Sequence, residues 1–221
     1  MGGRKFSIVF ALLALLSLTG SECVFVAKSG GSSTDEDEQG SNLVVVIKDG
    51  RLIDAPVQGV SYRSGTLAGV TGSGGEFQYQ AGEKVRFFIG DIALGQAVEG
   101  KAVITPLDLV AQGTLDSPAV INIARLLQSL DARPDDAHIT IPATVRTAAV
   151  RTHDGVASAI QFLDFADESA FANSAAQLIA TLTAGYPFTA VLVDAESARA
   201  HLRASLAALG GTSAADPGSE Q

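Results

Sequence analysis

The chain has 221 residues, with 15 Lys and Arg against 24 Asp and Glu and a formal net charge of −9. A hydrophobic fraction of 47% with 18% charged residues excludes a wholly disordered protein. The acidic balance argues against a nucleic-acid partner, which needs clustered Lys and Arg to neutralise phosphates. The single cysteine excludes an intrachain disulfide and a cysteine-rich zinc site.

The N-terminal 22 residues have the features of a secretory signal peptide. Arg4 and Lys5 give a positive start, residues 6–18 form an apolar run, and residues 19–21 are small. The apolar run is shorter than the roughly 20 residues of a membrane-spanning helix. Residues 1–22 are therefore predicted to direct export to the periplasm, the outer membrane or the cell surface. A short N-terminal membrane anchor is the alternative.

Cys23 directly follows this predicted signal. The segment 18–23 resembles the lipobox of bacterial lipoproteins, although the acidic Glu22 stands where that pattern has a small residue. The resemblance implies a lipid on Cys23 that attaches the protein to a membrane. Ordinary cleavage near Ser21, which would leave a free thiol, remains the alternative. Residues 23–42 are rich in Gly, Ser and acidic residues and are predicted to be a flexible linker.

Residues 43–110 have the pattern of a small β-domain. Apolar or alternating runs at 43–47, 57–63, 76–79, 84–89, 92–94 and 102–105 are separated by turn signals at 48–50, 72–75 and 81–83. Short strands at this spacing predict a small antiparallel β-sandwich, transthyretin-like or immunoglobulin-like in architecture.

Two motifs in this region carry a resemblance to a known module. The sequences Ala-Pro-Val-Gln-Gly-Val at 55–60 and Gly-Gly-Glu-Phe-Gln-Tyr at 74–79 resemble the carboxypeptidase regulatory-like (transthyretin-like) module. That resemblance implies a β-sandwich that is usually a non-catalytic accessory. Residues 42–131 also resemble an uncharacterised family of exported proteins and lipoproteins of proteobacteria, which implies no particular reaction.

Residues 111–209 are predicted to be helical. Ser117 can cap a helix with Pro118 in its first turn, and apolar residues follow at positions 120, 123, 124, 127 and 130 on one face. Shorter helices are predicted at 141–150, 157–165 and 169–183. A last helix is predicted from Asp194 to a stop at Gly210, before a disordered tail at 210–221. Strands followed by helices predict an α+β protein.

The sequence contains no complete catalytic motif. His138, His153 and His201 form no zinc-binding pair, and no Gly-x-Ser-x-Gly nucleophile motif occurs. Phe162, Phe165 and Phe171 stand close together and are predicted to pack in the core. The alternative is that they line a cavity for a hydrophobic ligand.

A weak calcium site is the one metal hypothesis. Asp131, Asp135 and Asp136 follow a predicted helix, as calcium ligands often do. Arg133 lies among them and would repel a cation, so a solvated loop is the alternative. Apart from calcium, no cofactor is expected.

These features predict a non-catalytic protein of the cell envelope. It would act as a binding or scaffolding module, with an envelope protein or a hydrophobic ligand as partner. The alternatives are a surface adhesin or assembly component that uses a sheet edge, and an enzyme accessory. The accessory would use His153 and Asp154, or the loop at 131–136, as a hidden hydrolytic or calcium site.

Overall fold

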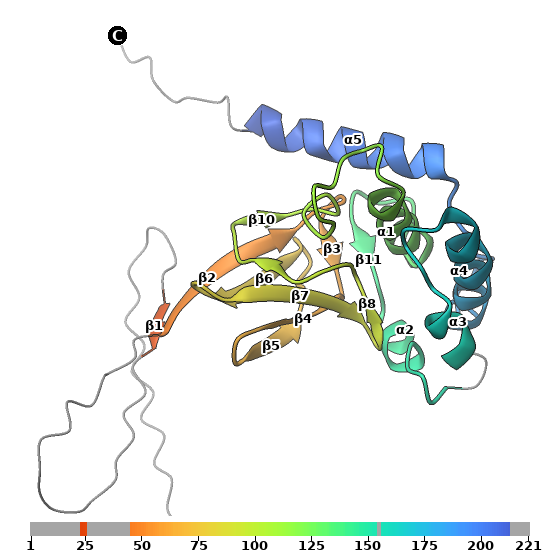
Figure 1. The fold of residues 1–221 in the computed structure, drawn as a ribbon, viewed down its shortest axis with the longest axis horizontal. Coiled ribbons are helices and arrows are strands. Elements are labelled where there is room, and N and C mark those ends of the chain that lie inside the picture. The colour runs from red at the N-terminus through yellow and green to blue at the C-terminus, as the bar shows by residue number, and fades with distance from the viewer. Residues whose placement is uncertain (1–22, 26–44, 154–155, 213–221) are drawn as a thin grey trace, which may run out of the picture.

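A computed structural model describes residues 23–25, 45–153 and 156–212. The strands are β1 (Cys23–Phe25), β2 (Val45–Leu52), β3 (Val57–Gln58), β4 (Ser61–Ser64), β5 (Leu67–Val70), β6 (Glu76–Gln80), β7 (Lys84–Ile89), β8 (Ile92–Ala93), β9 (Val98–Glu99), β10 (Val103–Ile104) and β11 (Ile139–Thr140). The helices are α1 (Pro118–Ser129), α2 (Ala143–Ala148), α3 (Ala157–Gln161), α4 (Glu168–Leu182) and α5 (Ala195–Thr212). Strands β1 to β10 precede the helices along the chain, and only β11 of the described strands lies between helices, after α1 (Figure 1). The predicted α+β class is therefore confirmed.

Several sequence-based predictions lie outside the described residues. They are the signal peptide at 1–22, residues 26–42 of the linker, Asp154, and residues 213–221 of the tail. The first three residues of the predicted linker do have a described conformation, because β1 pairs antiparallel with β2 and places Cys23 opposite Ile47.

The strands form three sheets. The first sheet contains β1, β2 and β10, and β6 also pairs with β2. The second sheet has the order β5-β4-β7-β8, and β9 also pairs with β7. The third sheet joins β3 and β11. The β2–β10 and β3–β11 pairs are parallel, whereas the sequence pattern predicted antiparallel strands throughout. Parallel pairing needs a long connection, and both pairs have one: β10 follows the hairpins of both larger sheets, and β11 follows α1.

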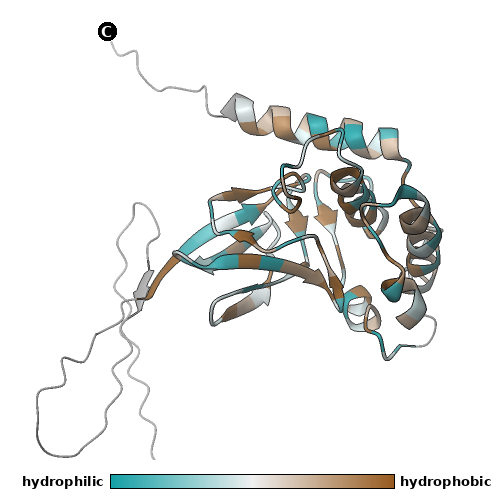
Figure 2. Cartoon of the chain, in the orientation of Figure 1, coloured by the Kyte–Doolittle hydropathy of each residue, from teal (hydrophilic) through white to brown (hydrophobic). Residues whose placement is uncertain are grey.

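The core begins where the two larger sheets face each other. Phe77 of β6 packs edge-on against Phe87 of β7, with ring centroids 5.1 Å apart, and Tyr62 of β4 lies 5.8 Å from Phe77. The same buried cluster continues into the helices through Leu127 of α1 and Leu178 of α4. Figure 2 shows hydrophobic residues predominating along α1, whereas α5 mixes hydrophobic and hydrophilic residues.

Helix α1 packs as its sequence predicts, but its predicted cap is not formed. Pro118 occupies the first turn, and the predicted apolar face is buried throughout: Val120, Ile123, Ala124, Leu127 and Leu130. The Ser117 hydroxyl does not cap the helix, because it accepts the backbone N–H of Thr114 instead.

Helix α5 packs along α1 through few apolar contacts. Its buried side chains, Ala198 and Leu202, contact the outer side of α1, and Asp194 caps it by accepting the N–H of Ser197. The predicted stop at Gly210 is wrong, because α5 continues to Thr212. Gly210 is exposed and has no neighbour within 4 Å of a Cβ position, so no packing favours a left-handed stop there.

The three phenylalanines do not form one core group. Phe171 is fully buried and stacks 5.5 Å from the partly buried Phe165, but Phe162 is 64% exposed. The core prediction is therefore wrong for Phe162. Helix α3 ends at Gln161, so Phe162 and Phe165 do not share a helix face as their spacing suggested.

The turn predicted at residues 48–50 is also wrong, because β2 runs straight through it to Leu52. Gly50 lies opposite Phe77 in the β2–β6 register. A Cβ on Gly50 would lie 2.5 Å from the Phe77 ring and 2.6 Å from the carbonyl oxygen of Lys101. Glycine is therefore needed here for the close approach of the aromatic ring rather than for a turn.

We expect Gly50→Ala to lower the free energy of unfolding by about 1–3 kcal/mol, because the methyl group overlaps a buried ring and a backbone carbonyl. Chemical denaturation measures the change. Gly185→Ala is the matched control, since nothing lies within 4 Å of its Cβ position. Equal stabilities of the two variants would contradict this account of Gly50.

Candidate functional site

A pocket of about 220 Å³ lies at the C-terminal end of α1. It is lined by Ala55, Gln128, Asp131, Pro134, Asp136, Ala137, His138, Ile139, Val193 and His201. We call it the Asp131 pocket. Four parts of the chain build it: the end of α1, the loop from Asp131 to β11, the β2–β3 connection, and α5 with the segment before it.

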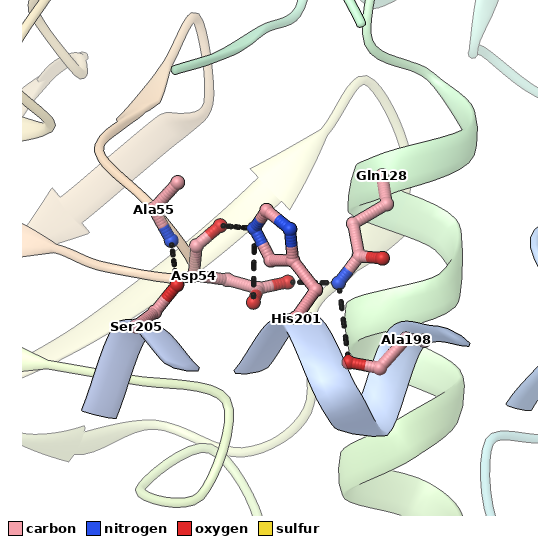
Figure 3. A network of polar contacts seen from close by, with 6 residues as sticks. All are labelled: Asp54, Ala55, Gln128, Ala198, His201 and Ser205. Carbon is pink, nitrogen blue, oxygen red and sulfur yellow. Dashed lines mark hydrogen bonds and ion pairs between the residues drawn. The ribbon is translucent and has the colours of Figure 1, made fainter. Parts of the chain in front are cut away.

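A buried carboxylate, that of Asp54, lies behind this pocket. The Asp54 side chain is inaccessible to solvent, and its Oδ2 accepts a hydrogen bond from Gln128 Nε2 at 3.0 Å. Its Oδ1 has no hydrogen-bond partner and lies 3.9 Å from His201 Nε2. The same ring nitrogen is 3.2 Å from the Asp54 carbonyl oxygen. Figure 3 shows the carboxylate held between His201 of α5 and Gln128 of α1.

Further polar contacts hold α5 against the β2–β3 connection. The Ser205 hydroxyl oxygen, one turn after His201, accepts the backbone N–H of Ala55 at 3.0 Å. Gln128 Nε2 also lies 3.5 Å from the carbonyl oxygen of Ala198 (Figure 3). The residues that place His201 in the pocket wall therefore come from three distant parts of the chain.

Burial makes the carboxylates of this region weaker acids. Desolvation raises the pKa of Asp54 from 3.8 to about 6, against the opposing effects of the Gln128 hydrogen bond and the His201 charge. Desolvation also raises the pKa of Asp131, although its carboxylate accepts two backbone N–H groups. Both carboxylates thus lack enough compensating positive charge for their degree of burial.

The structure brings together two of the three aspartates predicted as calcium ligands. Asp131 and Asp136 line the pocket, whereas Asp135 does not. Asp131 Oδ1 accepts the N–H groups of Arg133 and Thr140, both at 2.9 Å, and so shapes the loop. In the described part of the chain, no three His, Cys, Asp or Glu side chains are grouped so that they could hold a metal ion.

Asp136 contacts a histidine, His138, that also lines the pocket. Its Oδ1 accepts the backbone N–H of His138 at 2.7 Å and lies 3.7 Å from His138 Nδ1. Each of the two histidines in the pocket wall therefore lies beside one carboxylate.

Sequence reasoning missed Asp54 and considered His201 only as one of three histidines that form no zinc-binding pair. The two residues are 147 positions apart, and Asp54 stands next to Ala55 and Pro56, where an acidic residue ordinarily indicates a turn. The only local signal was an aspartate directly after the apolar pair Leu52 and Ile53.

A second hollow of about 370 Å³ lies where α4 joins the segment leading to α5. Its lining consists of Ala, Thr, Pro and aromatic residues between positions 180 and 190, with no charged side chain. Tyr186 in this wall donates its hydroxyl to the carbonyl oxygen of Leu130 at 2.6 Å. The larger hollow therefore offers much less polar chemistry than the Asp131 pocket.

The Asp131 pocket provides hydrogen-bond acceptors and titratable rings. The Ser205 hydroxyl oxygen, close to His201 on α5, accepts the backbone N–H of Ala55. The arrangement is suited to binding a polar or cationic group.

The chain was compared with family models, curated proteins and solved structures, and none of them matches it. The described helices include none that is long and apolar enough to cross a membrane. The class established for this protein is α+β.

We expect the buried Asp54 to make the protein less stable as the pH rises from about 4 to about 6. The unfolded chain releases this proton near pH 3.8 and the folded chain near pH 6, so the stabilising contribution is complete below pH 3.8 and is lost as the pH passes 6. A shift of this size corresponds to roughly 3 kcal/mol.

Urea denaturation of the wild type and of Asp54→Asn between pH 4 and pH 7 measures this effect. The variant keeps an acceptor for Gln128 but cannot ionise, so the difference between the two curves isolates Asp54 from the other carboxylates. Parallel pH curves for the two proteins would contradict the raised pKa.

Proposed function

We propose that this protein is a non-catalytic component of the cell envelope that acts as a binding or scaffolding module. The observation that carries the proposal is the Asp131 pocket, whose carboxylates and histidines are held by hydrogen bonds to the surrounding backbone and side chains. Groups fixed in this way recognise a ligand by position. The signal-like N-terminus supports export.

The proposal includes a transthyretin-like sandwich for the β region. Gly59, in the first motif of the resemblance, has a positive φ of 88° between β3 and β4, a conformation that glycine adopts without steric cost. Phe77 and Tyr79, in the second motif, are both buried on one face of β6. These features support two facing sheets joined by hairpins.

The proposal also includes a lipid on Cys23. Because Cys23 is the first residue of β1, a lipid there would hold the folded part close to the membrane.

One observation favours the second candidate function, an adhesin or assembly component. Strand β5 is at the edge of its sheet, consists of uncharged residues only, and ends at Val70, which is 46% exposed. Uncharged edges can accept a strand from another protein. The two candidates therefore use different surfaces of the molecule.

Replacing Cys23 with Ser tests the anchor. If Cys23 carries lipid, the wild type incorporates radiolabelled palmitate in cells and stays with the membrane fraction, whereas Cys23→Ser does neither. Equal labelling of the two forms, or labelling of neither, would contradict the lipoprotein part of the proposal.

Site-specific photocrosslinking in cells distinguishes the two candidate functions. A photoreactive residue at Ala137, in the pocket wall, should capture a defined partner, whereas one at Ala68, on β5, should not. Ala204 is the matched control, because it is an exposed residue of α5 that does not line the pocket. Specific capture at Ala68 alone would favour the adhesin, and equal capture at all three sites would contradict both.

A further inference from the structure

We propose that the Asp131 pocket binds a primary alkylammonium group, either that of a small amine or that of a lysine side chain on a partner. This inference rests on the proposed binding function and specifies its ligand chemistry. It follows from the charge, the hydrogen-bond acceptors and the apolar walls of the pocket.

The charge around the pocket favours a cation. Asp131 and Asp136 line it, and the buried carboxylate of Asp54 lies directly behind. The pocket lies at the C-terminal end of α1, whose last turn contains no basic residue, so the partial negative charge of that helix end adds to the carboxylates. The ion-pair partners of Asp54 and Asp136 are histidines, which are positive only when protonated.

Carboxylate oxygens that no described hydrogen bond uses line the pocket and can accept from an ammonium group. Both hydrogen bonds of Asp131 go to Oδ1, which leaves Oδ2 for a ligand. Asp136, which also lines the pocket, likewise accepts the His138 N–H through Oδ1. Asp54 Oδ1 lies behind His201 and adds negative charge rather than a direct contact with the ligand. An ammonium group has three N–H donors and no acceptor, and charge-assisted bonds to carboxylates are the strongest it can make.

The remaining walls suit a methylene stem. Pro134, Ala137, Ile139 and Val193 contribute apolar surface to the pocket. Lysine-like chains bury their stems along such surface while the charged end meets polar groups. A pocket of about 220 Å³ is smaller than the roughly 300–1,000 Å³ of most ligand sites, so it fits one short chain better than a large ligand.

Calcium fits the same residues less well. Ca²⁺ takes six to eight oxygen ligands, whereas Asp135 is outside the pocket and Asp131 Oδ1 is occupied by backbone N–H groups. The few free carboxylate oxygens of the pocket suit one ammonium group better than a calcium ion.

The test is a titration, at pH 7, of the protein isolated from cells. NMR chemical shifts of the protein report binding of each probe. The probes are n-butylammonium, a short lysine-containing peptide, the same peptide with norleucine in place of lysine, and calcium. We expect the first two to shift signals of residues around the pocket. Asp131→Asn, which keeps the Oδ1 acceptor for the loop, should weaken binding about tenfold, whereas Asp135→Asn should not change it.

Each outcome decides the question. Binding of the peptide without binding of butylammonium identifies the lysine of a partner as the source, and the reverse identifies a small amine. No binding of either probe at millimolar concentration, equal affinity in Asp131→Asn, or binding of calcium alone would overturn the inference. Because photocrosslinking at Ala137 reports the partner independently, the binding function could survive that failure.

A second variant tests the same inference in case Asp131→Asn does not fold. His201→Lys places a resident ammonium beside Asp54, so it should abolish binding of both amine probes while the thermal midpoint stays the same or rises. Unchanged amine affinity in a folded His201→Lys protein would also overturn the inference.

Discussion

The burial of the Asp54 carboxylate is the constraint on which the arrangement around the Asp131 pocket depends. An ionised carboxylate removed from water costs several kcal/mol unless partners compensate it. Here the partners come from α1, through Gln128, and from α5, through His201. Helix α5 has only two fully buried side chains among its described residues, Ala198 and Leu202. Its position is therefore set by polar contacts as well as by apolar packing.

The Asp131 pocket exists because this contact brings α5 to the end of α1. If α5 were displaced, the pocket would lose His201, and the segment that carries Val193 would no longer be fixed by the hydrogen bond between the Val193 N–H and Ser129. The C-terminal end of α1 would then be open to water, and the carboxylates of Asp54 and Asp131 would return toward their ordinary acidity. Fold and site are thus coupled through one buried group.

The sequence was most informative where structure is set by neighbouring residues. The strand pattern from β6 to β7 and the apolar face of α1 were predictable from periodicity alone, as was the capping of α5 by Asp194. Interpretation of single residues was less successful where the determining contact was distant. Gly50 looked like a turn residue because Phe77 was not known to lie against it, and Phe162 looked buried because the end of α3 was not apparent.

The candidate site was predictable only in part, for the same reason. Asp131 and Asp136 stood out because they are close in sequence, but the Asp54 partners are 74 and 147 residues away. No local pattern indicates that an aspartate beside a proline will be buried under a distant helix. Only the assembled structure places Asp131 beside the histidine of α5 and in front of a third carboxylate.

Burying carboxylates in this region costs desolvation free energy, and a purely structural role does not explain why amides do not stand there instead. A neutral side chain at position 54 could accept from Gln128 without the desolvation penalty that raises the pKa of the carboxyl. Asp131 could likewise hold its loop as an amide, since only Oδ1 accepts the two backbone N–H groups. Carboxylates at both positions gain an advantage over amides when a positive charge lies nearby in the pocket. A cationic partner would therefore turn a destabilising feature of the free protein into binding energy.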